Sequence, residues 1–265
     1  MKVNNIKLNN GVLIPQIGYG VFEIPKEITK QCVLCALKTG YRHIDTAFAY
    51  NNEKEVGEAV RESGLKREEI FVTTKVYGAK DYDDACRKIE RALEVLNIGY
   101  IDLMLIHWPQ DDNVALYKAM EHYYHEGKLR SIGLSNFYGS ELDNILNNTE
   151  VVPVLDQIEA HVFKNQKEMQ KILESKDIVL EAWSPLAAAK FDIFLNPLLV
   201  KLSVKYKKTT AQIALRYLYQ RGMIILPRSK NEGRIKENID IVDFNIDDGD
   251  MNKIDSLNQD RSVFG

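Results

Sequence analysis

The feature that most constrains the fold of this chain is a regular alternation of short apolar runs with longer amphipathic segments. Eight runs have the character of buried β-strands, at 16–20, 42–45, 70–76, 101–107, 129–135, 154–159, 178–183 and 223–227. The segments between and after them show the apolar spacing of helices, at 27–39, 52–63, 82–96, 113–126, 139–147, 166–174, 197–220 (two helices) and 231–239. Eight strand–helix pairs predict an α/β fold, a parallel sheet closed into a (β/α)8 TIM barrel.

A doubly wound sheet is the main alternative, but no GxGxxG fingerprint follows any of the strands. The length of 265 residues is close to the roughly 250 residues that a (β/α)8 barrel needs, so we expect one domain spanning 1–265. Asn10-Gly11 separates the short apolar runs IKL and VLIP, which predicts a β-hairpin. We expect this N-terminal hairpin to cap the bottom of the barrel.

Composition narrows the class of protein. A net charge of -3 and a pI near 6.0 leave no basic field for binding nucleic acid. No run of 18 apolar residues could span a membrane, and the polar start MKVNNIKLNN is unlike a signal peptide. Three cysteines are too few for a disulfide framework. We therefore expect a cytoplasmic monomer that acts on a small molecule without a metal ion.

Chemically active side chains follow the predicted strands at one end. Strand 42–45 ends at Asp45, strand 70–76 carries Lys75 near its end, and strand 101–107 ends at His107. Tyr50 lies in the loop after Asp45. Catalytic groups of a TIM barrel come from these carboxyl ends. The later strands add further polar and aromatic candidates at the same end, Ser135, Asn136, Gln157, Trp183, Ser184, Arg228 and Ser229.

Tyr50, Lys75 and Asp45 form a set suited to proton donation. A phenol titrates near ~10, and an ammonium ~4 Å away at an effective dielectric constant of ~20 contributes on the order of 4 kcal/mol. That energy corresponds to a possible lowering of the tyrosine pKa by roughly three units, before any desolvation cost. Asp45 would keep Lys75 charged, and His107 could orient a carbonyl oxygen. Each residue alone could equally be a structural ion pair, and Lys75 could instead be the Schiff-base lysine of an aldolase.

Several motifs in order resemble the aldo-keto reductase family along essentially the whole chain. They are GYRHIDTAFAYNNEKEVGEAV (40–60), FVTTKV (71–76), IDLMLIHWP (101–109), GKLRSIGLSNF (127–137), LDQIEAH (155–161), EAWSPL (181–186) and LPRSKNEGRIKEN (226–238). The resemblance implies the (β/α)8 fold, NADP(H) as cofactor and reduction of a small carbonyl substrate. The similar subgroup is that of small microbial 2,5-diketogluconate reductase and prostaglandin F synthase-like enzymes. A non-catalytic NADPH-binding regulatory subunit is a second reading of the same likeness.

The resemblance also assigns residues. Asp45, Tyr50, Lys75 and His107 match the catalytic tetrad, with Tyr50 as general acid. The residues that match the nicotinamide and pyrophosphate contacts are Ser135, Asn136, Gln157, Trp183, Ser184 and Leu186. Those that match the 2′-phosphate and adenine contacts are Arg228, Ser229, Arg234, Glu237 and Asn238. Independently of the resemblance, positive charges clustered at a helix start suit an anionic group, although a solvated basic helix start remains the plain alternative.

Several departures from the family pattern stand out. Asp156 stands where the family commonly has asparagine, so we leave Asp156 out of the site. The segment Ala187–Ala189 replaces frequent glycines, and alanine disfavours positive φ, so we expect altered clamping of the cofactor. The segment after Trp108 is short and the sequence ends at SVFG, which together predict an open pocket with modest substrate selectivity. We expect three aromatic residues near strand ends to line that pocket, Phe22, Phe48 and Trp108.

Other conspicuous residues have simpler interpretations. The CxxC pair Cys32 and Cys35 lies within a predicted helix beside apolar residues, which favours core packing over redox chemistry. His122 and His125 have no evident third ligand, so we expect a solvated helix face. A leucine stripe with helical spacing predicts ordinary core, at Leu195, Leu198, Leu199 and Leu202.

Overall fold

In a computed structural model, which describes residues 3–110 and 112–264, eight parallel strands form one sheet in sequential order. The strands are β3 (Tyr19–Gly20), β4 (His43–Asp45), β5 (Phe71–Val76), β6 (Leu103–Ile106), β7 (Ile132–Ser135), β8 (Leu155–Glu159), β9 (Val179–Trp183) and β10 (Ile224–Ile225). The sheet closes on itself, because Ile17 bridges Ile225 in parallel and the Gly18 N–H donates to the Ile225 carbonyl over 2.9 Å. The predicted TIM-type barrel is confirmed.

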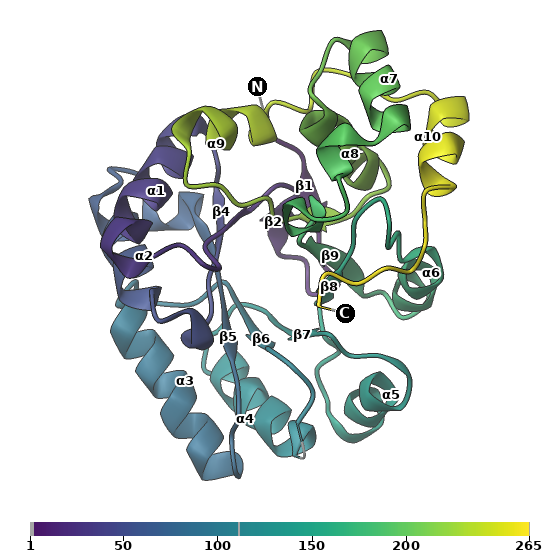
Figure 1. Cartoon of the computed structure of the whole chain (residues 1–265). Coiled ribbons are helices and arrows are strands. Elements are labelled where there is room, and N and C mark those ends of the chain that lie inside the picture. The colour runs from purple at the N-terminus through teal and green to yellow at the C-terminus, as the bar shows by residue number, and fades with distance from the viewer. Residues whose placement is uncertain (1–2, 111, 265) are drawn as a thin grey trace.

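Helices surround the barrel as an outer ring (Figure 1). They are α1 (Lys26–Thr39), α2 (Glu53–Glu62), α3 (Tyr82–Leu96), α4 (Asn113–His125), α5 (Gly139–Asn148), α6 (Lys167–Glu174), α7 (Pro197–Tyr206), α8 (Thr210–Gln220), α9 (Glu232–Ile239) and α10 (Asp248–Asp255). The segment predicted to hold two helices divides into α7 and α8, with Lys207 in a left-handed conformation ending α7. The helix α10 was not predicted. No helix in the described part of the chain is both long and apolar enough to cross a bilayer.

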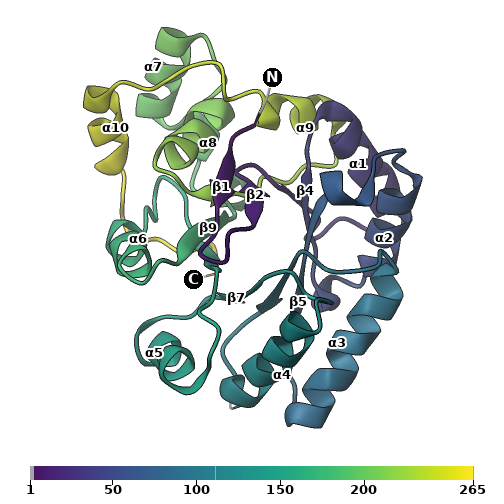
Figure 2. The ribbon, with the colours of Figure 1, turned by 180° about the vertical axis from the view of Figure 1, so that it is seen from behind.

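The N-terminal hairpin closes the bottom of the barrel, as predicted. Its strands are β1 (Asn5–Lys7) and β2 (Leu13–Pro15), and Figure 2 shows them lying across that end. Gly11 takes the positive φ of 85° that the turn requires. Leu8 and Ile14 are buried in one cluster with residues at the starts of barrel strands, namely Phe71, Leu103, Leu155 and Ile224. The opposite end, at the carboxyl ends of the strands, is left open for a site.

The leucine stripe is only partly core, which corrects one prediction. Leu199 and Leu202 of α7 are buried, but the Leu195 side chain is 74% exposed. Leu195 belongs to a separate 3-10 turn, η4 (Ile193–Leu195), and Asn196 caps α7 after it. Leu195 therefore does not share a helix with the other three leucines. In α1, Cys32 is buried, Cys35 is half-buried, and neither forms a disulfide.

Candidate active site

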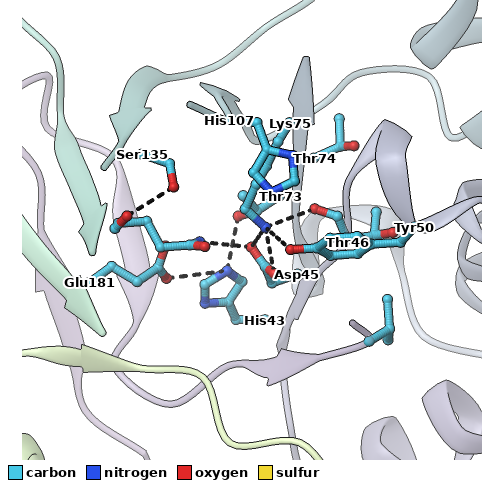
Figure 3. Close-up of polar contacts among 12 residues, drawn as sticks. His43, Asp45, Thr46, Tyr50, Thr73, Thr74, Lys75, His107, Ser135 and Glu181 are labelled. Carbon is cyan, nitrogen blue, oxygen red and sulfur yellow. Dashed lines mark hydrogen bonds and ion pairs between the residues drawn. The ribbon is translucent and has the colours of Figure 1, made fainter. Parts of the chain in front are cut away.

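The four residues of the predicted tetrad come together at the open end of the barrel (Figure 3). Asp45 ends β4, Lys75 lies near the end of β5, and His107 directly follows β6. Tyr50 ends the short 3-10 turn η1 (Phe48–Tyr50). Asp45, Tyr50 and His107 line a cavity of about 1010 Å³, the upper end of the usual range for ligand pockets.

Lys75 is buried beneath the cavity and is held by Asp45. Its Nζ lies 2.7 Å from each Asp45 carboxylate oxygen, 3.0 Å from the Thr46 carbonyl and 3.4 Å from the Tyr50 hydroxyl. Burial alone would lower the pKa of Lys75, but Asp45 together with Tyr50 and Glu181 more than offsets burial, and the pKa is raised. The amine is thus charged and 1% exposed, which leaves the aldolase alternative without support, since a Schiff-base lysine must present a neutral amine.

The Tyr50 hydroxyl keeps its proton more tightly than the sequence suggested. Burial raises the pKa of Tyr50 above its ordinary value, and the charge of Lys75 only partly opposes this. The lowering expected from Lys75 left out the desolvation cost, and burial is the larger effect. Asp45, which lies 2.7 Å from the Lys75 ammonium, raises the pKa of Tyr50 further. Tyr50 is a protonated donor at neutral pH.

His107 is a neutral imidazole facing the same space. Burial, followed by the charge of Lys75, lowers the pKa of His107 to about 3. Its ring centre lies 5.5 Å from that of Tyr50, edge to face. A neutral imidazole carries one N–H, so His107 can donate a hydrogen bond to a carbonyl oxygen that also meets the Tyr50 hydroxyl.

A second group of polar side chains lines the cavity between the tetrad and Trp183. The Trp183 indole N–H donates to Asn136 Oδ1 over 2.9 Å, and Asn136 Nδ2 donates to the Ser135 hydroxyl and the His107 carbonyl. Asn136 has a positive φ of 67°. Ser135, Asn136, Gln157 and Trp183 therefore form one hydrogen-bonded surface beside the tetrad.

A buried carboxyl group was missed by the sequence analysis. Glu181 of β9 is fully buried, and Gln157 Nε2 donates to both Glu181 (2.8 Å) and Asp45 (2.9 Å). Burial and the neighbouring Asp45 raise the pKa of Glu181 well above its usual range. His43 Nε2 lies 3.8 Å from a Glu181 carboxylate oxygen (Figure 3), and burial lowers the pKa of His43 to about 3. The sequence feature that could have identified Glu181 is a charged residue inside the apolar run IVLEAW.

The other end of the cavity is polar and more open. Arg228 and Ser229 follow β10, and Arg234 lies in the first turn of α9. The Arg228 guanidinium pairs with Glu23, and Ser229 is buried. Asn238 is buried in α9, and Glu237 accepts a hydrogen bond from the Thr209 hydroxyl over 2.7 Å. All five predicted residues line the cavity, together with Glu23 and Thr209.

The aromatic wall differs from the predicted one. Phe22 and Trp108 line the cavity, with Phe22 5.0 Å from the Tyr50 ring. Phe48 does not: its ring instead makes a cation–π contact with the Arg91 guanidinium of α3 at 4.8 Å. Val263 and Phe264 join the lining instead, and the Phe264 ring lies 5.4 Å from that of Trp183.

This C-terminal segment covers part of a pocket that was expected to be open. In the short segment after Trp108, Asp111 falls outside the described residues.

The segment after Trp183 corrects the expectation about alanines. Ser184 and Ala187–Ala189 all have positive φ, between 48° and 60°. Ser184 and Leu186 line the cavity as predicted. Alanine thus adopts here the left-handed conformation that was expected to be limited. Each such residue is strained by roughly 1 kcal/mol, so the surrounding contacts must hold the segment in place.

Comparison with known proteins agrees with this geometry. The model of the "Aldo/keto reductase family" matches residues 16–259. The glyoxal reductase of Bacillus subtilis is 42% identical over 264 residues, which cover 98% of this chain and 95% of that protein. The 9,11-endoperoxide prostaglandin H2 reductase of Trypanosoma cruzi is 39% identical over 99% of this chain and 94% of its own length.

Solved structures give the same result. An aldo-keto reductase from a Medee basin deep-sea metagenome library superposes with a TM-score of 0.96 at 38% identity, covering 99% of this chain and 97% of that one. The Bombyx mori aldo-keto reductase in complex with NADP superposes with a TM-score of 0.91 at 32% identity, covering 99% and 95%. The chain therefore belongs to the aldo/keto reductase family, a family of NADP(H)-dependent carbonyl reductases.

Proposed function

We propose that this chain reduces an aldehyde or ketone to an alcohol with NADPH, and that Tyr50 donates the proton to the carbonyl oxygen. The single observation that carries this proposal is the arrangement of Tyr50, Lys75, Asp45 and His107 at one end of a family barrel. The product of the reaction is a secondary or primary alcohol, so the reverse reaction uses a CH–OH donor. A complete tetrad argues against a purely regulatory subunit.

The cavity fits NADPH, which when bound supplies the hydride. Its polar end has the arginines that suit a 2′-phosphate, Arg228 and Arg234. Its inner end has amide groups for a carboxamide and the Trp183 ring for an aromatic face. The residues that we propose to hold the cofactor are Ser135, Asn136, Gln157, Trp183, Ser184, Leu186, Arg228, Ser229, Arg234, Glu237 and Asn238.

The inferred proton transfer follows from the order of basicities. Tyr50 keeps its proton while the substrate is a neutral carbonyl, since burial raises the pKa of Tyr50. An oxygen that gains negative charge becomes more basic than a phenolate and takes the proton. Lys75, 3.4 Å from the phenol oxygen, then stabilises the phenolate. His107 donates to the same substrate oxygen and holds the carbonyl in place.

The test uses the absorbance of reduced nicotinamide with a panel of aldehydes and diketones. NADPH should be oxidised in preference to NADH. Tyr50→Phe should lower kcat by at least ~10²-fold, with the Kd for NADPH unchanged. If Tyr50→Phe kept the turnover of the unaltered protein, Tyr50 would not be the proton donor.

We also infer a cytoplasmic monomer. The three cysteines are free, in keeping with a reducing compartment. Sedimentation velocity checks the oligomeric state, and a dimer at micromolar concentration would contradict it.

A further inference from the structure

The segment Asp260–Phe264 reaches the cavity and is anchored by a residue of β8. Glu159 accepts hydrogen bonds from the Ser262 hydroxyl and the Val263 N–H, each over 2.7 Å. The N–H groups of Gln259 and Arg261, just before these residues, donate to the Phe163 carbonyl. The segment is therefore fixed at several backbone points, and the last described residues line the cavity.

Glu159 is itself held rigidly. It is 4% exposed, and His161 Nε2 lies 3.0 Å from one of its oxygens. Although burial alone would raise it, the pKa of Glu159 is lowered by the hydrogen bonds from His161, Ser262 and Val263. The acceptor is thus an ionised carboxylate, which makes the stronger, charge-assisted hydrogen bonds.

The position of Glu159 in the sheet connects this anchor to the active site. Glu159 is the register partner of Trp183 in the neighbouring strand, and Gln157 lies two residues earlier on the same face of β8. The segment held by Glu159 therefore ends beside the Trp183 ring. Phe264 lies 5.4 Å from that ring, tilted by 44°.

Phe264 cannot hold this position through its own burial. Its side chain is 66% exposed, so apolar packing contributes little to fixing it. The anchors lie in the residues before it: the Lys190 ammonium donates to the Val263 carbonyl, and the Arg261 guanidinium lies 4.0 Å over the Phe191 ring. Of these contacts, only those to Glu159 come from a barrel strand.

We propose that Glu159 is a specificity-determining residue, which seats Phe264 against Trp183 and so gives the substrate cavity an apolar wall. That wall has three rings, those of Phe22, Trp108 and Phe264, and it adjoins Trp183, whose ring we propose to face the cofactor. It favours carbonyl compounds with an aromatic or long apolar group over two-carbon dicarbonyls. The proposal rests on the proposed carbonyl reduction, because selectivity is read from turnover.

A double-mutant cycle tests the proposal. The kcat/KM ratio for 4-nitrobenzaldehyde over glyoxal is measured with NADPH for Glu159→Ala, Phe264→Ala and the double variant. Each single variant should lower the ratio about tenfold, the effect of losing one apolar pocket contact. The double variant should lower it no further than Phe264→Ala alone, since Glu159 acts through Phe264.

Two conservative variants protect the test against misfolding. Glu159→Gln can still accept from His161 and Val263 and can donate to Ser262, so it should keep the ratio. Ser262→Ala loses one hydrogen bond and should give a smaller decrease, even if Glu159→Ala does not fold. Glu168→Ala, an exposed glutamate on α6, is the matched control and should change nothing.

A readout independent of turnover separates this proposal from the proposed function. The sequence has two tryptophans, so Trp108→Phe leaves Trp183 as the single indole fluorophore. In that background, Glu159→Ala and Phe264→Ala should increase acrylamide quenching of Trp183 to the same extent.

Additive effects on the ratio, equal losses for both aldehydes, or unchanged quenching would overturn the role of Glu159. If the protein oxidised no NADPH but the quenching of Trp183 responded as stated, the proposed function would be refuted. The proposal that Glu159 positions Phe264 against Trp183 would still hold.

Discussion

The two ends of the cavity are built in different ways. At the inner end, Asp45, Lys75 and Gln157 are buried, lie on barrel strands and hydrogen-bond to one another. At the outer end, Arg228 and Arg234 are exposed and lie on loops or the start of α9. The inner end is preorganised by the fold, whereas the arginines of the outer end are long cationic side chains in contact with solvent.

This difference indicates a division of work. Groups that stabilise charge during a reaction act best when their positions are fixed and water is excluded. A phosphate can be bound by side chains that move to meet it, because charge-assisted hydrogen bonds supply the binding energy. We therefore expect changes at the inner end to affect folding and turnover, and changes at the outer end to affect cofactor affinity.

The largest expected effect is on folding stability at the inner end. Lys75→Met leaves the Asp45 carboxylate buried without its partner, which should lower the free energy of unfolding by roughly 3–5 kcal/mol. Urea denaturation measures this. Arg234→Met at the outer end should change stability by less than about 0.5 kcal/mol. Adding Asp45→Asn to Lys75→Met should restore part of the lost stability. If Lys75→Met and Arg234→Met changed stability equally, the two ends would not differ in preorganisation.

The next effect depends on pH and concerns Asp156 of β8, the residue before Gln157. Burial raises the pKa of Asp156 to about 8. The folded protein thus holds a proton that the unfolded chain releases near its ordinary pKa, and stability is lost as the pH rises toward 8. Asp156→Asn should stabilise the protein on the order of 2 kcal/mol at pH 9 and not at pH 4. Urea denaturation of both proteins at pH 9 and pH 4 measures this difference. An equal gain in stability at pH 4 would contradict a protonated, buried Asp156.

At the outer end the expected effect is on cofactor choice. Removing a charge-assisted contact to the 2′-phosphate by Arg228→Ala or Arg234→Ala should reduce the preference for NADPH over NADH by about tenfold each. Fluorescence titration of both cofactors measures the ratio. Lys236→Ala, a neighbouring exposed lysine on α9, is the control. A ratio unchanged by either arginine variant would show that the 2′-phosphate binds elsewhere.

The smallest expected effect lies in the segment that connects the two ends. Ala188 has a φ of 50° and is exposed, so glycine relieves strain there without leaving a void. Ala188→Gly should raise the free energy of unfolding by up to about 1 kcal/mol. Ala115→Gly within helix α4 should lower it by about the same amount. Thermal unfolding compares the two, and a loss of stability in both would mean that Ala188 is not strained.

The sequence patterns predicted what depends on local periodicity. The apolar runs and helical stripes indicated all eight strands and the helices from α1 to α9, because buried strands and amphipathic helices differ in spacing. The short helix α10 was missed, since its sequence DGDMNKID has only two apolar residues, Met251 and Ile254, to mark a helical face. Strand ends also indicated the tetrad, because a parallel barrel places them together.

What could not be predicted depends on contacts between distant residues. The contact of Glu159 with Val263 joins residues 104 positions apart, and no local signal marks it. Phe48 packs against Arg91 of the distant helix α3, and the positive φ values of Ala187–Ala189 are imposed by their surroundings. The raised pKa of Tyr50 depends first on how deeply the fold buries the phenol, which spacing alone does not give.

The most direct test of the account compares Tyr50→Phe with Arg234→Ala in two measurements. For each variant, the Kd for NADPH and the single-turnover rate of NADPH oxidation at saturating cofactor and aldehyde are determined. We predict that Tyr50→Phe loses at least ~10²-fold in rate with an unchanged Kd, and that Arg234→Ala loses affinity with a nearly unchanged rate. A Tyr50→Phe variant that keeps its rate, or an Arg234→Ala variant that loses rate without affinity, would contradict the division of work between the two ends.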